Sequence, residues 1–214
     1  MVISPNAVLH FWFQDCRPYQ WFRRNAHFDA VVIDRFGKLT SSALNGELTS
    51  WEQNATGALA LVLILDQFTR QIWRDQPRAF AGDPHSLRLT DQAIANGWLA
   101  EEPERVRRQF WLMPMLHSEQ LGVIQEAVSV MERWSDPATV AVARRNQDLI
   151  QRFGRYPQRN AALGRPSTQE ELEFLKDWQS RGKTKKSQSH ACEQCSSQGT
   201  IHYRVKTAAQ PNWQ

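Results

Sequence analysis

Eight consecutive apolar residues, ALALVLIL, occupy positions 58–65, and polar residues follow them at once. A helix that is apolar on every side belongs in the interior of a protein, where other helices can cover it. The run is too short for a membrane span, which needs roughly 18 apolar residues or more. We therefore expect 58–65 to form the centre of a helical domain, and we look for chemistry where the run ends, at Asp66, Gln67 and Arg70.

Apolar spacing, capping residues and helix breakers predict helices along the first part of the chain, and no segment there has a convincing strand pattern. The Asp-Pro pairs at 83–84 and 136–137 are typical of an N-cap followed by proline in the first turn. Pro114 predicts a kink within a helix that continues to Met131. We predict an all-α fold of about seven helices in antiparallel pairs, the main ones covering 28–44, 56–73, 83–96, 103–131, 140–153 and 170–178.

Residues 179–214 are rich in Lys, Ser, Gln and Thr and poor in large apolar side chains. Such a segment cannot bury enough surface to offset its ordering entropy, so we predict a folded domain over 1–178 and a disordered tail over 179–214. The tail holds six Lys and Arg against Glu193 alone, a net +5, so the domain carries −1 of the total charge of +4. Only the tail therefore offers an electrostatic case for binding nucleic acid.

Three cysteines, Cys16, Cys192 and Cys195, are too few for a disulfide framework. The N-terminus has no basic region ahead of an apolar one, which argues against export. These features predict a cytoplasmic protein without a membrane partner. His190, Cys192, Cys195 and His202 have the composition of a zinc site, but their spacing fits no standard finger, so we assign neither a metal nor another cofactor.

Asp66 and Arg70 are four residues apart on one predicted helix, so they share a face and can form an ion pair. His117 continues the apolar face formed by Phe110 and Met113. Two interpretations of these polar residues are open. They can hold the helices together, or they can belong to a functional site.

A short connection between two predicted helices is rich in arginine, with Arg152, Arg155, Arg159 and Arg165 around Asn160. Guanidinium groups bind carboxylates and phosphates through paired hydrogen bonds, so the loop can form an anion cradle. The same arginines can instead cap helix ends and pair with acidic side chains elsewhere. The sequence leaves both interpretations open.

Five segments, in this order and spacing, resemble the bacterial domain of unknown function 924 family: HFWF, LDQFTRQIWR, PRAFAGD, FWLMPMLHSE and RFGRYPQRNAALGRPSTQEELEFL. The resemblance covers the chain from Leu9 to about Leu175 and implies a helical superhelix similar to tetratricopeptide-repeat folds. It implies no activity. The family usually has His where this chain has Gln147 and Gln158. The positions that match the family are Asp66, Gln67, Phe68, Arg70, His117, Ser118, Glu119, Arg155, Pro157, Arg159, Asn160, Gly164 and Arg165.

Two classes of function are compatible with these residues. The first is a helical scaffold that binds a protein partner or a small anionic ligand in a polar groove. The second is an enzyme such as a hydrolase, with Asp66, His117 or Glu119 as acid or base and arginines holding negative charge. The candidate binding residues are Asp66, Gln67, Arg70, His117, Glu119, Arg155, Arg159, Asn160 and Arg165.

Overall fold

The computed structural model describes residues 3–187, with side chains through Ser180, and the chain divides after Glu171 into two compact units. Residues 3–187 form eleven α-helices and no strand, so the predicted all-α class is confirmed. In chain order the helices are α1 (Pro5–His10), α2 (Pro18–Phe22), α3 (Ala26–Leu44), α4 (Ala55–Val62), α5 (Thr69–Ile72), α6 (Asp83–Ala95), α7 (Trp98–Glu101), α8 (Arg105–His117), α9 (Leu121–Trp134), α10 (Pro137–Phe153) and α11 (Gln169–Ser187).

The helices outnumber the seven that the sequence predicts. Several are very short: α1 has six residues, α2 has five and α7 has four. Segments of that length hold too few apolar positions to show a helical period, so the sequence does not predict them as helices. The tetratricopeptide-like superhelix stays a prediction.

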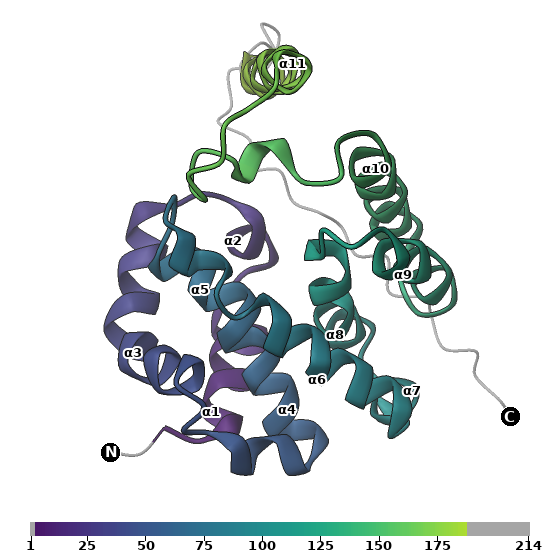
Figure 1. Cartoon of the computed structure of the whole chain (residues 1–214). Coiled ribbons are helices and arrows are strands. Elements are labelled where there is room, and N and C mark those ends of the chain that lie inside the picture. Colours follow the sequence, from purple (N-terminus) through teal and green to yellow (C-terminus); the bar gives the residue numbers. More distant parts are fainter. Residues whose placement is uncertain (1–2, 188–214) are drawn as a thin grey trace, which may run out of the picture. The chain divides into compact units, whose positions relative to one another are not determined.

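The apolar run 58–65 lies at the centre of the first unit. α4, a π-helical segment at Leu63–Phe68 and α5 follow one another without interruption and form one central helix. Every residue of the run is at most 2% exposed, and α1, α3, α6 and α8 contact the central helix (Figure 1). The expectation that this helix is buried on all sides is therefore confirmed.

Gly57 and Gly82 allow close contact between two backbone segments, Gly57 with Trp51 and Gly82 with Leu65 of the central helix. A Cβ atom on Gly57 would lie 2.2 Å from the carbonyl oxygen of Trp51, and one on Gly82 would lie 2.3 Å from the carbonyl oxygen of Leu65. Both distances are far shorter than van der Waals contact, so a larger residue would push the segments apart. The second contact presses the start of α6 against the π-helical segment, and Asp83 follows directly.

α8 ends at His117, whereas the sequence predicted one kinked helix running through Pro114 to Met131. Pro114 does lie inside α8, but the chain leaves the helix at Ser118, whose backbone is extended. The hydroxyl oxygen of Ser118 accepts a hydrogen bond from the backbone N–H of Gln120. Such a local side-chain bond competes with the helical ladder, and α9 begins as a separate helix.

The two predicted Asp-Pro caps have different outcomes. Asp136 caps α10, and its carboxylate accepts hydrogen bonds from the backbone N–H groups of Ala138 and Thr139 at 2.9 and 3.0 Å. At α6 the cap position is taken by Gly82, and Asp83 is the first helical residue. The Asp83 carboxylate is therefore not a cap and is available for other contacts.

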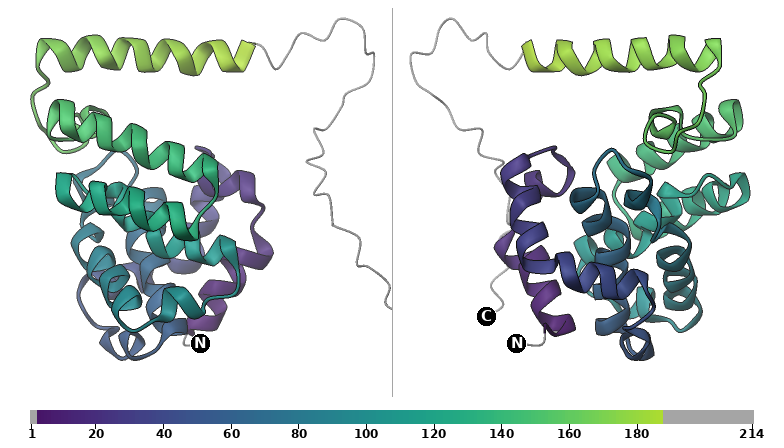
Figure 2. Two further views of the ribbon diagram at one scale, coloured as in Figure 1. Left: turned by 90° about the vertical axis from the view of Figure 1, so that its right-hand side faces the viewer. Right: turned by 60° about the vertical axis from the view of Figure 1, so that its left-hand side comes forward.

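α9 and α10 lie side by side, joined by a short turn, and α9 contacts α8 (Figure 2). The carbonyl oxygen of Leu116, near the end of α8, accepts hydrogen bonds from Asn146 Nδ2 at 3.0 Å and from the Tyr156 hydroxyl at 2.7 Å. These two bonds satisfy a carbonyl group that the helix end leaves open. They also fix His117, the next residue, relative to α10.

α11 runs to Ser187 rather than ending at Trp178, so residues 179–187, which their composition assigned to the tail, are helical. Within residues 3–187 no three His, Cys, Asp or Glu side chains are grouped so as to hold a metal ion, and no helix is long and apolar enough to cross a membrane. The zinc-like tract lies outside the described residues: His190, Cys192, Cys195 and His202.

Candidate functional site

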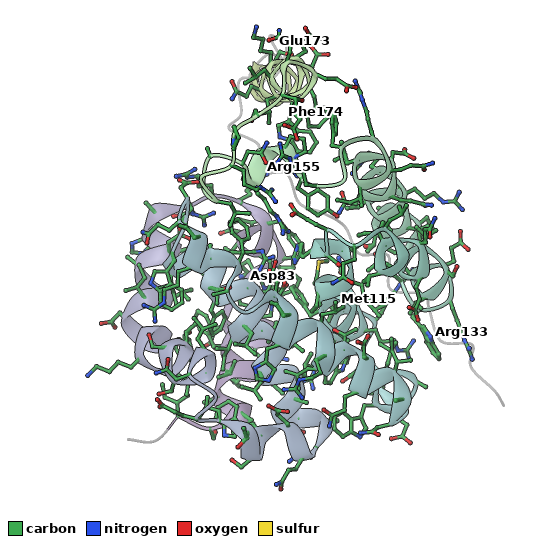
Figure 3. All side chains as sticks on the ribbon, in the orientation of Figure 1. Asp83, Met115, Arg133, Arg155, Glu173 and Phe174 are labelled. Atoms are coloured by element: carbon green, nitrogen blue, oxygen red, sulfur yellow. The ribbon has the colours of Figure 1, made fainter. Side chains whose placement is uncertain are left out.

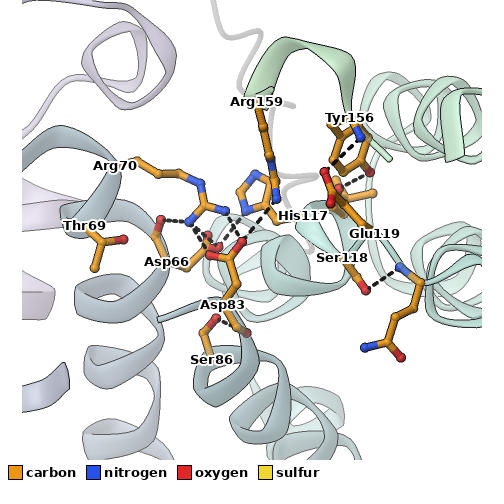
Figure 4. A network of polar contacts seen from close by, with 12 residues as sticks. Asp66, Thr69, Arg70, Asp83, Ser86, His117, Ser118, Glu119, Tyr156 and Arg159 are labelled. Carbon is orange, nitrogen blue, oxygen red and sulfur yellow. Dashed lines mark hydrogen bonds and ion pairs between the residues drawn. The ribbon is translucent and has the colours of Figure 1, made fainter. Parts of the chain in front are cut away.

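Five ionisable side chains from distant parts of the sequence meet in the first unit and form a charged cluster: Asp66, Arg70, Asp83, His117 and Arg159 (Figure 4). His117 Nδ1 lies 2.6 Å from Asp66 Oδ1. Arg70 Nη1 lies 3.2 Å from the same oxygen and 2.8 Å from Asp83 Oδ1. Arg159 Nη1 lies 3.3 Å from Asp83 Oδ2. Two guanidinium groups thus face two carboxylates, and the cluster is electrically balanced.

The cluster begins where the central helix changes from α to π geometry, at Leu63–Phe68. In this wider turn the side chains of the next residues bind the backbone. Thr69 Oγ1 donates to the carbonyl oxygen of Leu65 at 2.8 Å, and Arg70 Nη1 donates to that of Asp66 at 2.6 Å. Short π segments within helices are frequent at functional sites, which makes this turn a candidate.

Asp66 is ionised and His117 is neutral at pH 7. Burial alone would raise the pKa of the fully buried Asp66, but His117, Arg70 and a hydrogen bond from Gln67 outweigh it and hold the pKa at about 2. Burial lowers the pKa of His117 below its usual value, and the charges of Arg70 and Arg159 act in the same direction against the attraction of Asp66. A neutral imidazole beside a carboxylate carries its proton on the nitrogen that faces the carboxylate, here Nδ1.

A cavity of about 390 Å³ opens beside the charged cluster, a volume within the range of small-molecule sites. Its walls come from α2 and the residue that follows it, from the central helix and its end, and from α8 and α10. The lining combines apolar and aromatic side chains with polar and cationic ones. The lining residues are Trp21, Phe22, Arg23, Gln67, Arg70, Gln71, Arg74, Gln109, Met113, Leu116, His117, Thr139, Val142 and Asn146.

One polar residue of the first cavity, Gln71, has a side-chain carbonyl oxygen that accepts no hydrogen bond from the described residues. Gln71 is only 7% exposed, and its Oε1 atom is buried without a hydrogen-bond partner among the described residues. The amide nitrogens of Gln67, Gln109 and Asn146 already donate to protein oxygens. A buried carbonyl oxygen without a donor is costly, so Gln71 marks a place where a bound molecule can donate a hydrogen bond.

A second cavity, of about 310 Å³, also has His117 in its lining. It is lined by Asp83 and Glu119, by Arg159 and by apolar side chains that include Phe80. His117 contributes to the lining of both cavities, and 24% of its side chain is exposed. The imidazole is thus the group that the two cavities share.

Glu119, which lines this second cavity, forms a separate pair with Arg165. Arg165 donates to both carboxylate oxygens of Glu119, at 2.6 and 3.0 Å, and the backbone N–H of Tyr156 donates to Glu119 at 2.9 Å. Burial alone would raise the pKa of Glu119, but these hydrogen bonds outweigh burial and lower the pKa below its usual value. A carboxylate held ionised by three donors is poorly suited to act as an acid. The same hydrogen bonds connect the 155–166 loop to the residues just before α9.

Arg155 and Asn160 join a third group, and Figure 3 shows Arg155 apart from Asp83 of the charged cluster. Arg155 donates to both carboxylate oxygens of Glu171 at 2.7 and 2.9 Å, and Asn160 Nδ2 donates to the same carboxylate at 3.2 Å. The hydrogen bonds from Arg155 are the main reason that the pKa of Glu171 falls to about 2. Arg152 pairs with Glu170 at the surface. Each arginine of the loop therefore faces a carboxylate of the protein.

A family model described as "Bacterial protein of unknown function (DUF924)" matches residues 8–178. The chain belongs to this family. Among solved structures, a protein of unknown function from Agrobacterium tumefaciens is similar, with 32% sequence identity and a TM-score of 0.75, and the match covers 81% of this chain and 97% of that one. Among curated proteins, none matches the chain. Family membership confirms the resemblance of the five segments and assigns no chemistry.

Within this DUF924 protein the structure brings five of the sequence-derived candidates to the cluster or its cavity: Asp66, Gln67, Arg70, His117 and Arg159. Sequence reasoning missed important neighbours. The sequence predicts Asp83 as a helix cap, although its presence in the PRAFAGD segment is a signal for a shared role. Gln71 has no signal beyond its position four residues after Gln67. The two positions that depart from the family, Gln147 and Gln158, line neither cavity.

Proposed function

We propose that this DUF924 protein binds a small organic acid in the first cavity, with its apolar part against the aromatic side chains of the lining and its acidic group at an arginine. The observation that carries the proposal is the composition of the lining. It includes Arg23, Arg70 and Arg74 and not one carboxylate. A cavity with cationic and apolar walls favours a ligand that is apolar at one end and negatively charged at the other.

The three arginines differ in what they can offer. Arg70 is paired with two carboxylates, and Arg74 donates to both oxygens of Asp29 at 2.8 and 2.6 Å. Arg23 is exposed, lies over the ring of Tyr19, and has no carboxylate partner among the described residues. Arg23 therefore supplies the surplus positive charge at the cavity, and we assign the acidic group of the ligand to it.

The apolar part of the ligand would contact Trp21 and Phe22, which come from α2, and Met113 and Leu116, which come from α8. The rings of Trp21 and Phe22 both pack on Phe110, so the aromatic wall is anchored in the core. An aromatic acid matches this wall, because flat rings stack on one another with little loss of conformational entropy.

Isothermal titration of the full chain with phenylacetate and indole-3-acetate, against the neutral phenylacetamide and indole-3-acetamide, tests the proposal. We expect the acids to bind more tightly than their amides. Arg23→Gln should weaken phenylacetate binding by about 1 kcal/mol, or roughly fivefold in Kd, because one exposed charge pair is lost. Arg144→Gln is the matched control, since Arg144 is an exposed arginine of α10 that pairs with Glu132 away from this cavity.

Two results would contradict the proposal. One is equal affinity for the acids and their amides, which would show that charge plays no part in recognition. The other is an equal effect of Arg23→Gln and Arg144→Gln, which would show that the charge of the whole surface, rather than the cavity, attracts the acid.

A further inference from the structure

We propose that the first cavity is also a catalytic site, in which His117 acts as general base for the hydrolysis of a carboxylic ester. This inference rests on the proposed binding of organic acids, because the acid is the product: its carboxyl group forms beside His117 and Arg70 and is then held by Arg23, which lines the same cavity. The geometry that carries it is the bond of 2.6 Å between Asp66 Oδ1 and His117 Nδ1, together with the presence of His117 in the lining of both cavities.

Asp66 orients the imidazole and sets its tautomer. The carboxylate is completely buried, also accepts a hydrogen bond from Gln67, and faces Arg70, so it is ionised and acts as an acceptor only. His117 therefore donates through Nδ1 and carries a lone pair on Nε2. Nε2 makes no hydrogen bond or ion pair within the described part of the chain, as Figure 4 also shows.

A second histidine shows that a carboxylate partner alone does not make a base. His85 is paired with Glu52 at 2.8 Å and has 25% of its side chain exposed, almost the same as His117. However, His85 uses Nε2 for this pair, shares the carboxylate with Arg88, and lines neither cavity. What distinguishes His117 is that its available nitrogen belongs to a residue that borders two cavities.

The reaction needs only water and the ester. Water that reaches the imidazole from the second cavity gives a proton to His117 Nε2, and its oxygen forms a bond to the carbonyl carbon of the ester in the first cavity. The π electrons of the carbonyl move to its oxygen, which becomes an oxyanion. When this oxyanion re-forms the carbonyl, the bond to the alcohol oxygen breaks, and that oxygen takes the proton from Nε2. The products are a carboxylic acid and an alcohol, and the imidazole is neutral again.

Arg70 is placed to stabilise the oxyanion. Its two Nη atoms bind Asp66 and Asp83, whereas its Nε–H group makes no hydrogen bond with another described residue, and the side chain lines the first cavity. A donor held by two carboxylates, of which Asp66 is buried, needs little reorganisation when negative charge develops. Thr139 is a hydroxyl residue of the lining, and its Oγ1 donates a hydrogen bond to Asp136 rather than to His117, so our scheme takes water as the nucleophile.

The test is hydrolysis of p-nitrophenyl phenylacetate by the full chain, followed by the release of p-nitrophenolate. We expect saturable hydrolysis without a burst, slower in D₂O than in H₂O, with a rate that falls on the acid side as His117 becomes protonated. His117→Gln should lower kcat/KM by roughly 100-fold or more, as loss of a general base does. His85→Gln is the matched control and should leave the rate unchanged.

Diethyl pyrocarbonate gives a second measurement on the unmutated protein. Modification of His117, located by mass spectrometry, should abolish hydrolysis, and phenylacetate should slow that modification. Hydrolysis that survives complete modification of His117 would overturn the inference.

The two proposals fail in distinguishable ways. If phenylacetate binds but wild type and His117→Gln hydrolyse the ester equally, the catalytic inference is overturned and the binding function stands. If phenylacetate binds no better than phenylacetamide, the proposed function fails, and the catalytic inference that depends on it fails as well.

Discussion

Asp66→Asn removes one negative charge from the interior while keeping the shape of the side chain. In the wild-type protein the Asp66 carboxylate is inaccessible to solvent, accepts from His117 at 2.6 Å and faces Arg70 at 3.2 Å. Because asparagine fills the same volume, the substitution creates no cavity. Its effect on the free energy of unfolding therefore reports the electrostatic contribution of the carboxylate.

The size of the expected stability loss depends on the carboxylate contacts that Arg70 retains after the substitution. Removing one partner of a buried ion pair costs about 3–5 kcal/mol, because the remaining charge stays buried. Arg70 retains Asp83, with contacts of 2.8 and 2.9 Å, so we expect the lower end of this range, about 3 kcal/mol. For a domain of this size that corresponds to a fall in melting temperature of roughly 6–12 °C.

Urea unfolding at pH 7 measures this change as a shift of the midpoint at constant m-value. Asp75→Asn is the control, since Asp75 pairs with Arg24 at the surface, where both side chains are about two-thirds exposed. Exposed pairs contribute about 0–1 kcal/mol. A loss for Asp66→Asn no larger than for Asp75→Asn would refute the reasoning, because the charged cluster would then add nothing to stability.

We also expect the stability difference between wild type and Asp66→Asn to depend on pH. The pKa of Asp66 is lowered from 3.8 to about 2 in the folded state, so unfolding increases its proton affinity. Stability from the ionised carboxylate is therefore fully present above about pH 4 and is lost as the pH falls through about 2. The difference in unfolding free energy between wild type and Asp66→Asn should shrink on acidification, and a difference that stays constant down to pH 2 would contradict the assigned pKa.

Further predictions concern glycine packing and the buried thiol. Gly82→Ala should destabilise the protein by about 1–3 kcal/mol, because its Cβ would meet a backbone carbonyl oxygen at 2.3 Å. Gly37→Ala should instead stabilise the protein by about 0.5–1 kcal/mol, because Gly37 lies within α3 and its Cβ would meet no other atom. Chemical denaturation of both variants measures this contrast, and changes of the same sign would contradict it. Burial raises the pKa of Cys16 to about 12, so in a variant with Cys192 and Cys195 replaced by serine, iodoacetamide at pH 8 should label the native protein far more slowly than the urea-unfolded chain. Equal labelling rates in the two states would refute this.

The sequence allowed the helical class and the place of the central helix to be predicted, and both come from local physics. An uninterrupted apolar run such as 58–65 must be buried whatever surrounds it. The end of α8 after His117 was not predicted, because the hydrogen bond to the Ser118 hydroxyl that accompanies it leaves no mark on the apolar pattern. The contact between Asp66 and Arg70 was also foreseeable, since four residues on a helix fix which side chains share a face.

The arginine loop marks where local reasoning ends. Its composition predicted either an anion cradle or a set of internal ion pairs, and nothing in the spacing separates these alternatives. In the folded chain Arg155 is committed to Glu171, Arg165 to Glu119, and Arg159 to Asp83. The choice of partner depends on which carboxylates other segments bring within reach.

The sequence by itself determined that this chain is helical, that residues 58–65 form its centre, and that a polar group stands at the end of that helix, because periodicity and hydrophobicity act over neighbouring residues. Only the tertiary structure decided that Asp66 meets His117, 51 residues away, that Asp83 links two arginines, and that His117 lines two cavities. Such contacts depend on how whole helices pack, and packing is settled by the shapes and charges of all the segments together.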